Sequence, residues 1–391
     1  MAIKGRSDVA AGRIRLGMVG GGQGAFIGAV HRLAARMDDH YVLVAGALSS
    51  DPDRAKASGR EIGLADDRNY GSYLDMAKRE ARLKNGIEAV AIVTPNNMHF
   101  PIAREFLKRG IHVICDKPLT TKLRDARRLA HLVEKSGLVF VLTYNYTGYP
   151  MIRHARQMVA SGELGTIRVV QAEYAQDWLS RDLESTGQKQ AGWRTDPAQA
   201  GAGGSIGDIG THAYNLACFV SGLDADELSA DLTTFVPGRE LDDNAHMMLR
   251  FAGGARGMLW ASQVAPGNEN SLKLRVYGSE GGLEWRQESP NLLWYTPLGA
   301  ETRLITRGGA GAGEEAGRVT RIPPGHPEGY LEGFANIYTE AARAVRAARS
   351  GGDPEPGTLY PTVHDGVKGM AFVEACVKSS GRNGAWFKLP A

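Results

Sequence analysis

The sequence predicts an α/β protein in two parts: a doubly wound parallel sheet comes first, and an α+β part with a large, mostly antiparallel open sheet flanked by helices follows. Length is one reason, because 391 residues exceed one ordinary core and favour two domains. A second reason is that strands alternate with helical segments up to about residue 143, which is typical of parallel sheets with right-handed crossovers. Beyond that point, runs of period-two character take over. We therefore expect one domain over residues 1–143 and another over 144–391, whose last helix can pack back on the first domain.

The composition is that of a soluble globular protein, with 43% hydrophobic and 23% charged residues. Its 46 basic and 43 acidic residues are scattered and leave a net charge of +3, so nothing indicates a nucleic acid partner or binding to an anionic membrane. No apolar run follows the basic start of the chain, and none of about 18 residues occurs later, so we expect neither an export signal nor a membrane span. Cys115, Cys218 and Cys376 lie far apart without a CxxC pair, so we expect reduced thiols in a cytoplasmic protein and neither disulfides nor a zinc site.

A glycine-rich segment follows the first predicted strand, 13–20, and leads into a helix through residues 31–37. Strand, glycine turn and helix together indicate a pyrophosphate site, because bare N–H groups and the helix N-terminus then face the anion. This context predicts a Rossmann dinucleotide-binding domain. The spacing fits the dinucleotide fingerprint with Ala in the last position, and extra glycines suggest a loop lengthened by a few residues. The candidate cofactor-binding residues of this loop are Gly20, Gly22, Gln23, Gly24, Ala25 and Phe26.

The second predicted strand, 41–48, ends where a dinucleotide-binding domain usually holds an acidic residue for the ribose 2′-hydroxyl. This sequence has Ser49 there. Ser49 and Ser50 can donate to a 2′-phosphate, and Arg54 can neutralise it, which admits NADP. Asp51 can still reach the ribose, so NAD and NADP both stay open as the cofactor.

Three more strands complete the predicted parallel sheet, and helices connect them. The strands are expected at 89–93, 111–115 and 138–142, and the helices at 53–62, 71–83, 101–109 and 123–135. Polar turns follow the first two of these strands, and ligands of open α/β sheets bind at the carboxyl ends of strands. The further cofactor-binding candidates in these turns are Thr94, Pro95, Asn97, His99, Asp116 and Lys117.

The segment 201–215 carries the expected chemistry, because backbone freedom and titratable side chains meet in it. Four glycines stand between 201 and 207 and let main chain approach a ligand closely. Apolar residues from 209 to 220 then have helical spacing, which places Asp208 and His212 at i and i+4 on one face. A carboxylate beside an imidazole can orient it and raise its basicity, as is needed to accept a proton from an alcohol. The alternative is a capped core helix with His212 as a buried hydrogen-bonding residue.

Four motifs, in this order, resemble those of the Gfo/Idh/MocA oxidoreductases, the family of glucose–fructose oxidoreductase and inositol dehydrogenase. They are the glycine loop followed by His31, Thr94-Pro95-Asn96-x-x-His99, Asp116-Lys117-Pro118 and Gly203-Gly204-x-x-x-Asp208-x-x-x-His212. The resemblance runs from about residue 13 to the last helix. It implies NAD(P)-dependent transfer of a hydride between the nicotinamide and a secondary hydroxyl of a sugar, a sugar derivative or a cyclitol.

The resemblance also implies the roles of the catalytic group. Lys117 lies near the nicotinamide and the reacting hydroxyl and stabilises alkoxide charge, His212 is the general acid/base, and Asp208 orients His212 or holds a substrate hydroxyl. Asn215 stands where many relatives carry Asp, so its contribution is open. The lengthened glycine loop and the pair of serines after the second strand also depart from the common pattern.

Beyond residue 143, side chains that can contact a polyhydroxy substrate come from the linking segment and from the chain on either side of Asp208. The candidate substrate-binding residues are Asn145, Tyr146, Trp193, Arg194 and Asn215. Trp193 can stack on a sugar face, and Arg194 can bind a hydroxyl or a carboxylate. Alternatively, both side chains only stabilise the conformation of the loop. Tyr146 can equally serve packing between the domains.

The second sheet is predicted from a helix, a long strand and six later strand-like runs. The helix is expected at 151–161, and the strands at 166–174, 227–236, 245–251, 257–264, 272–277, 282–285 and 291–295. A glycine-rich loop at 307–313 and helices at 329–349 and 363–379 complete the chain. One face of such a sheet must be covered, so we expect helices and a neighbouring subunit there, in a homodimer or homotetramer.

Two other functions are compatible with the same resemblance. An NAD-dependent glycosidase would use transient oxidation at one sugar carbon and consume no cofactor. A nucleotide-sensing regulator on the same fold would lack catalysis, and the joint presence of Lys117, Asp208 and His212 argues against it. Residue type alone would allow a metal site built from Asp208, His212 and His326, but the family likeness predicts no metal.

Overall fold

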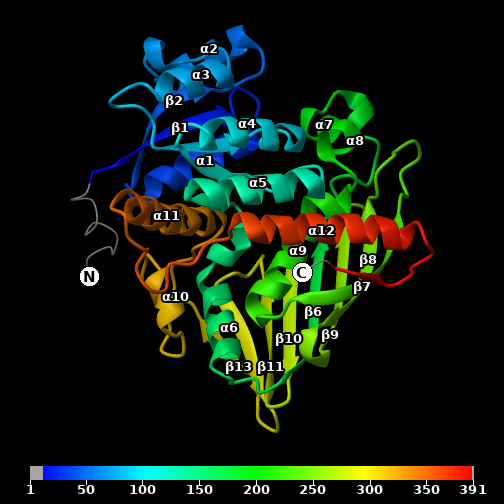
Figure 1. Ribbon diagram of the computed structural model, residues 1–391. Helices are drawn as coiled ribbons and strands as arrows, with labels where there is room; N and C mark the ends of the chain where they lie inside the picture. The colour runs from blue at the N-terminus through cyan, green and yellow to red at the C-terminus, as the bar shows by residue number, and fades with distance from the viewer. Residues whose placement is uncertain (1–11, 390–391) are drawn as a thin grey trace. The chain divides into compact units, whose positions relative to one another are not determined.

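Residues 12–389, which the computed structural model describes, fold into two units that each contain one sheet (Figure 1). The first unit takes the residues up to 120, 124–148 and 330–367, and the second takes 121–123, 149–329 and the residues from 368 onward. These units differ from the sequence-based division at residue 143, because the chain returns to the first unit late in the sequence.

The first sheet has five strands in the order β2-β1-β3-β4-β5. They are β1 (Ile14–Gly20), β2 (Tyr41–Ala47), β3 (Ala89–Val93), β4 (His112–Cys115) and β5 (Phe140–Leu142). Neighbouring strands are parallel throughout, which confirms the predicted sheet. Every residue of β3 is buried, as expected for a strand covered on both faces. The strand order reverses at β1 and β3, whose carboxyl ends therefore form the crevice where such sheets bind ligands.

The predicted helices connect these strands, and local signals set where they begin. They are α1 (Phe26–Met37), α2 (Pro52–Glu61), α3 (Tyr73–Glu80), α4 (His99–Leu107) and α5 (Leu123–Ser136). Asp51 caps α2 by accepting a hydrogen bond from the backbone of Arg54, and Pro52 follows at the first helical position. Ser72 caps α3 in the same way.

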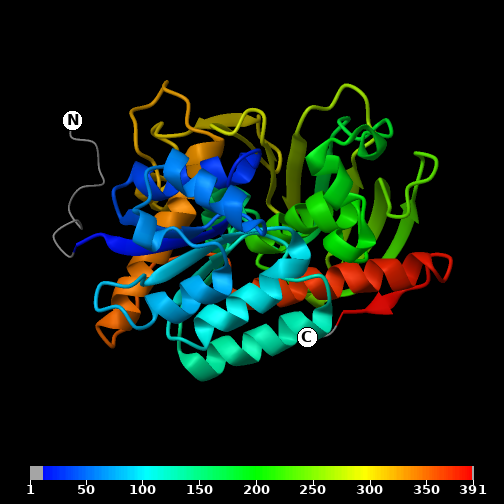
Figure 2. The ribbon, with the colours of Figure 1, turned by 90° about the horizontal axis from the view of Figure 1, so that it is seen from above.

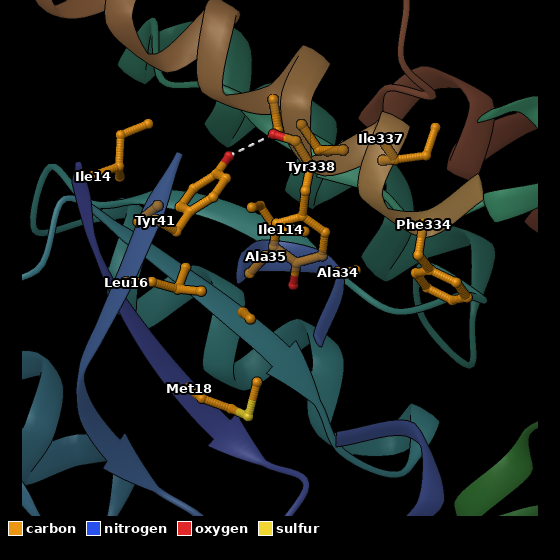
Figure 3. Close-up of a cluster of buried hydrophobic side chains, with 14 of the residues drawn as sticks. Ile14, Leu16, Met18, Ala34, Ala35, Tyr41, Ile114, Phe334, Ile337 and Tyr338 are labelled. Atoms are coloured by element: carbon orange, nitrogen blue, oxygen red, sulfur yellow. Dashed lines mark hydrogen bonds between the residues drawn. The ribbon is translucent and has the colours of Figure 1, made fainter. Parts of the chain in front are cut away.

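A late helix, α11 (Tyr330–Arg349), packs against the first sheet together with α1 (Figure 3). Its apolar residues recur at helical spacing, and Phe334 and Tyr338 lie in the same buried cluster as Leu16. The hydroxyl of Tyr41 donates to the carbonyl of Tyr338 at 2.9 Å. We expected that the last helix can pack back on the first domain; α11, the helix before it, also belongs to the first unit, together with the first residues of the last helix (363–367).

The second sheet has nine strands in the order β13-β12-β11-β10-β6-β9-β8-β7-β14. They are β6 (Ile167–Ala175), β7 (Ala225–Thr233), β8 (Asn244–Phe251), β9 (Arg256–Ser262), β10 (Ser271–Gly278), β11 (Gly281–Arg286), β12 (Leu292–Pro297), β13 (Arg303–Thr306) and β14 (Phe387–Lys388). Only the pair β6 and β9 is parallel among the pairings of these described strands. The predicted mostly antiparallel sheet is therefore confirmed.

The second sheet has one face covered by α6 (Pro150–Ala160) and α9 (Thr211–Ser221). In β10, Leu274 is buried, whereas its neighbours Lys273 and Arg275 are half-buried. This period-two burial matches the alternation in the sequence. The last helix, α12 (Val363–Ser380), begins in the first unit and continues into the second, where the chain turns and returns as β14 beside β7 (Figure 2).

Several short elements were not predicted from the sequence. Besides the edge strands β13 and β14, they are α7 (Lys189–Arg194), α8 (Pro197–Ala200) and α10 (Glu314–Arg318). Elements of this length show no clear periodicity, and α7 and α8 depend on side-chain caps from Gln188 and Asp196. Within residues 12–389, no helix combines the length and the apolarity needed to cross a membrane.

Candidate active site

The glycine loop follows β1 and ends where α1 begins at Phe26, as predicted. Gly20 has a φ of +81°, and a Cβ there would lie 2.6 Å from the carbonyl oxygen of Val93 at the end of β3. A Cβ at Gly28 would lie 2.2 Å from the carbonyl oxygen of Gly21. Gly28 therefore makes the close approach between helix and loop that the last small residue of the fingerprint provides. The sequence pattern fits the fingerprint with Ala25 in this last position. Because the loop is longer than usual, the close approach is made three residues later, at Gly28.

The loop backbone is held by the neighbouring elements. The backbone N–H of Gly22 donates to the carbonyl of Leu48 at 3.1 Å, and that of Gln23 donates to the Ser58 hydroxyl at 3.1 Å. The Gln23 side chain donates to Glu61 at 2.9 Å. The helix α1 that follows has no side-chain cap and no acidic residue in its first turn. Its N-terminal N–H groups therefore suit an anion, and the loop fits the pyrophosphate of a dinucleotide.

The end of β2 carries the residues that bear on cofactor choice. Asp51 is engaged as the cap of α2, and its backbone N–H donates to the Ser49 hydroxyl at 3.2 Å. An Nη of Arg54 would lie 3.8 Å from a Cβ at Gly24, so the guanidinium stands beside the glycine loop. Ser50 is exposed at the same strand end. The guanidinium of Arg54 and the hydroxyls of Ser49 and Ser50 thus lie at the strand end where dinucleotide-binding domains bind the adenosine ribose.

The turns after β3 and β4 meet through His99, the first residue of α4. This imidazole is only 1% exposed. Its Nδ1 lies 2.7 Å from the carbonyl oxygen of Pro118, and its Nε2 lies 3.0 Å from that of Thr94. Burial lowers the pKa of His99, and the nearby Asp116 carboxylate opposes this effect. Both ring nitrogens of this cofactor-binding candidate therefore face main chain.

The other candidates of these turns differ in exposure. Asn97 is exposed, and Pro95 and Lys117 are half-buried. Asp116 is half-buried, and its Oδ1 accepts from the backbone N–H of Lys117 at 2.9 Å and from the Thr143 hydroxyl at 3.0 Å. The linking segment continues as a 3-10 turn, η4 (Asn145–Gly148), in which Asn145 and Tyr146 are buried within the first unit.

In the second unit, Asp242 anchors the start of the segment 201–215. Its buried carboxylate accepts from the backbone N–H of Gly204 at 2.7 Å, from the Ser205 hydroxyl at 2.6 Å and from the backbone N–H of Ile206 at 2.8 Å. A Cβ at Gly204 would lie 2.1 Å from the carbonyl oxygen of Asp242, so only glycine fits there. Burial raises the pKa of Asp242, and these three donors act in the opposite direction.

The helix after this anchor starts with a π-helical turn, η6 (Ile206–Gly210), before α9 begins. We expected an α-helix through Asp208, with His212 four residues on. The expected helix is present from Thr211, but the turn that contains Asp208 is wider, so the ideal i, i+4 relation does not apply to the pair. The glycines on either side of Asp208 have low α-helix propensity. The backbone conformation of this turn is therefore set by its hydrogen bonds to Asp242 and not by an intrinsic preference for the α-helix. Such π turns are frequent at functional sites.

The Asp208 carboxylate is held from two sides. Its Oδ2 accepts from Arg194 Nε at 3.2 Å and from Gln263 Nε2 at 3.0 Å. Arg194 Nη1 donates to Gln190 Oε1 at 2.6 Å, and its guanidinium carbon lies 4.2 Å from the ring centroid of Trp193. Three of the predicted residues, Asp208, Arg194 and Trp193, are therefore brought together within the second unit. Asp242 and Gln263 escaped prediction, because they reach this segment from distant positions without any local motif.

His212 is buried on α9, where the ring of Tyr174 meets it edge-on at a centroid distance of 6.2 Å. Asn215, also buried, lies further along the same helix. Tyr174 was not among the predicted site residues; its hydroxyl donates to Asn270 at 2.7 Å. Among residues 12–389, no three His, Cys, Asp or Glu side chains are arranged so that they could hold a metal ion.

Two family models match successive parts of this chain. The model of the oxidoreductase family with an NAD-binding Rossmann fold matches residues 14–155, and that of the GFO/IDH/MocA C-terminal domain matches residues 152–284. A solved oxidoreductase from Sinorhizobium meliloti is 62% identical, with a TM-score of 0.89 over 96% of this chain and 99% of that one. An inositol dehydrogenase homolog from Azotobacter vinelandii, solved with NAD+, is 38% identical, with a TM-score of 0.92 over 96% of this chain and 97% of that one.

A levoglucosan dehydrogenase from Pseudarthrobacter phenanthrenivorans is 26% identical over 96% of this chain and 98% of that protein. The family models together match residues 14–284, which include the first sheet, most of the second sheet and the four motifs that carry the resemblance. The chain therefore belongs to the Gfo/Idh/MocA oxidoreductase family, with an NAD-binding Rossmann domain followed by the family's C-terminal domain.

Proposed function

We propose that this chain is a dehydrogenase that oxidises a secondary hydroxyl of a sugar, a sugar derivative or a cyclitol with NAD or NADP. The observation that carries the proposal is the Asp208 carboxylate, which Arg194 and Gln263 hold on the segment that leads to the buried His212. Similarity to an inositol dehydrogenase homolog and to a levoglucosan dehydrogenase supports a polyhydroxy substrate.

In the proposed mechanism, a nicotinamide cofactor held by the glycine loop after β1 and the N-terminus of α1 would supply the acceptor for the hydride of the carbon that bears the hydroxyl. His212 takes the hydroxyl proton as general base. Lys117 stabilises the negative charge that develops on the oxygen. Asp208, which Arg194 binds at 3.2 Å, serves as a hydrogen-bond acceptor for His212 or for a substrate hydroxyl.

Arg194 has a second part in this proposal. Its Nε binds Asp208 and its Nη1 binds Gln190, so Nη2 is the edge that would reach a substrate oxygen. Trp193 stacks on the same guanidinium and stiffens it. A substrate hydroxyl or carboxylate bound there would be fixed relative to Asp208.

The experiment that tests this function is a screen of sugars and cyclitols, followed by the absorbance of the reduced cofactor, with NAD and NADP in parallel. We expect reduction of the cofactor with at least one polyhydroxy compound. Release of free sugar without net reduction would instead support the glycosidase mechanism. Tight cofactor binding without turnover on any compound would support a regulator.

Arg54 is proposed to recognise the 2′-phosphate of NADP together with Ser49 and Ser50. We expect Arg54→Ala to raise the KM for NADP roughly 10- to 100-fold, because a charge-assisted contact to phosphate is lost, and to change the KM for NAD less than about twofold. Steady-state kinetics with both cofactors measures the two values. Equal effects on NAD and NADP would contradict the assignment.

We also propose that a second copy of the chain covers the open face of the second sheet, in a homodimer or homotetramer. Met248 and Met258 are paired across β8 and β9 on this face and are 53% and 43% exposed. Arg275, further along the same face, is paired with Glu173 and Glu284, so these three side chains would enter the interface already paired.

Light scattering after size-exclusion chromatography tests this interface. The wild type should elute as a dimer or tetramer, and Met258→Glu should shift it toward the monomer, because a symmetric interface would bring two copies of the new charge together. Leu33→Glu, at an exposed apolar residue of α1, is the control and should leave the mass unchanged. A monomeric wild type would refute the proposal.

A cytoplasmic location is part of the same proposal. Cys115, Cys218 and Cys376 are all free thiols in the structure. Free cysteines are the usual state in a reducing compartment.

A further inference from the structure

The carboxyl ends of three neighbouring strands of the first sheet are tied together by two side chains. His99 joins the end of β3 to the turn after β4, since its ring nitrogens lie 3.0 Å from the Thr94 carbonyl and 2.7 Å from the Pro118 carbonyl. Asp116 joins the turn after β4 to the end of β5, since its Oδ1 accepts from the Thr143 hydroxyl at 3.0 Å.

Lys117 stands between these two anchors. Its backbone N–H donates to Asp116 Oδ1 at 2.9 Å, and the backbone N–H of Asp116 donates to the carbonyl of Ile92 at 2.9 Å. On the other side, Pro118 has no N–H, so its carbonyl is its only backbone group that can form a hydrogen bond, and His99 contacts it. The main chain is therefore held immediately before and immediately after Lys117.

The two contacts of His99 are not equivalent. Burial favours the neutral imidazole, which carries a single proton and donates from one nitrogen only. We assign this proton to Nδ1, because its contact with Pro118 is the shorter of the two. The unprotonated Nε2 then faces the Thr94 carbonyl without forming a hydrogen bond, and the bond to Pro118 is the one that matters for Lys117.

We propose that His99 is a positioning residue: it acts through the Pro118 carbonyl to fix the place of the Lys117 ammonium, and it does not bind the cofactor. This role differs from the cofactor contact expected from the sequence. It rests on the proposed function in that Lys117 is taken to stabilise the alkoxide.

Two substitutions of His99 distinguish the role of Nδ1 from that of Nε2. The amide nitrogen of Asn reaches the place of Nδ1, whereas the amide nitrogen of Gln reaches the place of Nε2, so His99→Asn keeps the donor to Pro118 and His99→Gln removes it. We expect His99→Gln to lower kcat on the order of 100-fold, because small misplacements of a catalytic group have effects of this size, while His99→Asn stays within about threefold of the wild type. The KM for NAD should change less than about twofold in both variants, since neither nitrogen contacts the cofactor.

A second readout does not depend on turnover. The rate at which acetic anhydride modifies Lys117 can be followed by peptide mass spectrometry in the apoprotein. We expect His99→Gln to change this rate several-fold relative to the wild type and His99→Asn to leave it nearly unchanged. If the wild type oxidises no polyhydroxy compound, the proposed function fails, and the labelling still decides the role of His99.

His112→Gln is the matched control. His112 is a buried histidine at the opposite end of β4, where its Nδ1 accepts from the backbone N–H of Val139 at 3.0 Å. This variant should lose thermal stability without any change in Lys117 labelling or in kcat. The proposal is overturned if the Asn and Gln variants of His99 lose activity equally, if NAD affinity falls in place of kcat, or if Lys117 labelling is the same in all variants.

Discussion

Replacing Lys117 with methionine is expected to lower kcat roughly 10²- to 10³-fold, because the positive charge that stabilises the developing alkoxide is lost. Methionine keeps much of the length of the half-buried side chain, so the loss reports charge and not packing. Affinity for NAD should stay nearly the same, since the groups proposed to hold the pyrophosphate are the glycine loop and the N-terminus of α1. Steady-state kinetics with a substrate found in the screen, and a separate titration of NAD binding, measure the two effects.

Lys108→Met serves as the control for this prediction. Lys108 is exposed at the end of α4, so its substitution removes the same charge from the same unit without touching the strand ends. It should leave kcat and NAD binding unchanged. Turnover of Lys117→Met close to the wild-type value would show that alkoxide stabilisation comes from another group.

Replacing His212 with alanine is the second large effect, with an expected fall in kcat of about 10²- to 10⁴-fold. The reason is that His212 is the proposed acceptor of the hydroxyl proton while the hydride leaves. The KM for NAD should change little, because His212 lies in the second unit and the glycine loop in the first. Rates measured with saturating cofactor and substrate give kcat directly.

Asp208→Asn refines the assignment of His212. Asparagine keeps an oxygen for Arg194 and Gln263 but removes the negative charge, so a smaller loss of about 10- to 100-fold is expected if Asp208 orients the base. His364→Ala, at an exposed histidine at the start of α12, should have no effect. Near-normal turnover of His212→Ala would remove the general base from the mechanism.

Much of the fold could be predicted because its signals are local. The residues of β3 are apolar throughout and read as a strand buried on both faces. The glycine loop could be recognised because strand, turn and helix are contiguous. In β10, the alternation of Leu274 with Lys273 and Arg275 predicted one covered face. Short elements such as α7 and β14 escaped prediction, because six or two residues are too few to show a period.

In the candidate site, too, some residues could be predicted from local motifs and others could not. Asp208, His212 and Lys117 could be proposed from motifs, and their catalytic roles stay predictions. Asp242 and Gln263 could not be found, because they bond to the segment around Asp208 from 36 and 55 residues away. The contacts of His99 with two carbonyls were likewise invisible, because they join the ends of two strands that pair only in the folded sheet.

The sequence by itself determined the class of the fold, the order of its main elements and the chemical groups available for the reaction. The tertiary structure alone decided that α11 returns to the first sheet, that Asp208 lies in a π-helical turn anchored by Asp242, and that Arg194 binds the Asp208 carboxylate. The physical reason is that periodicity and turn chemistry act between near neighbours in the chain. Packing and hydrogen bonds between distant residues form only when the chain folds.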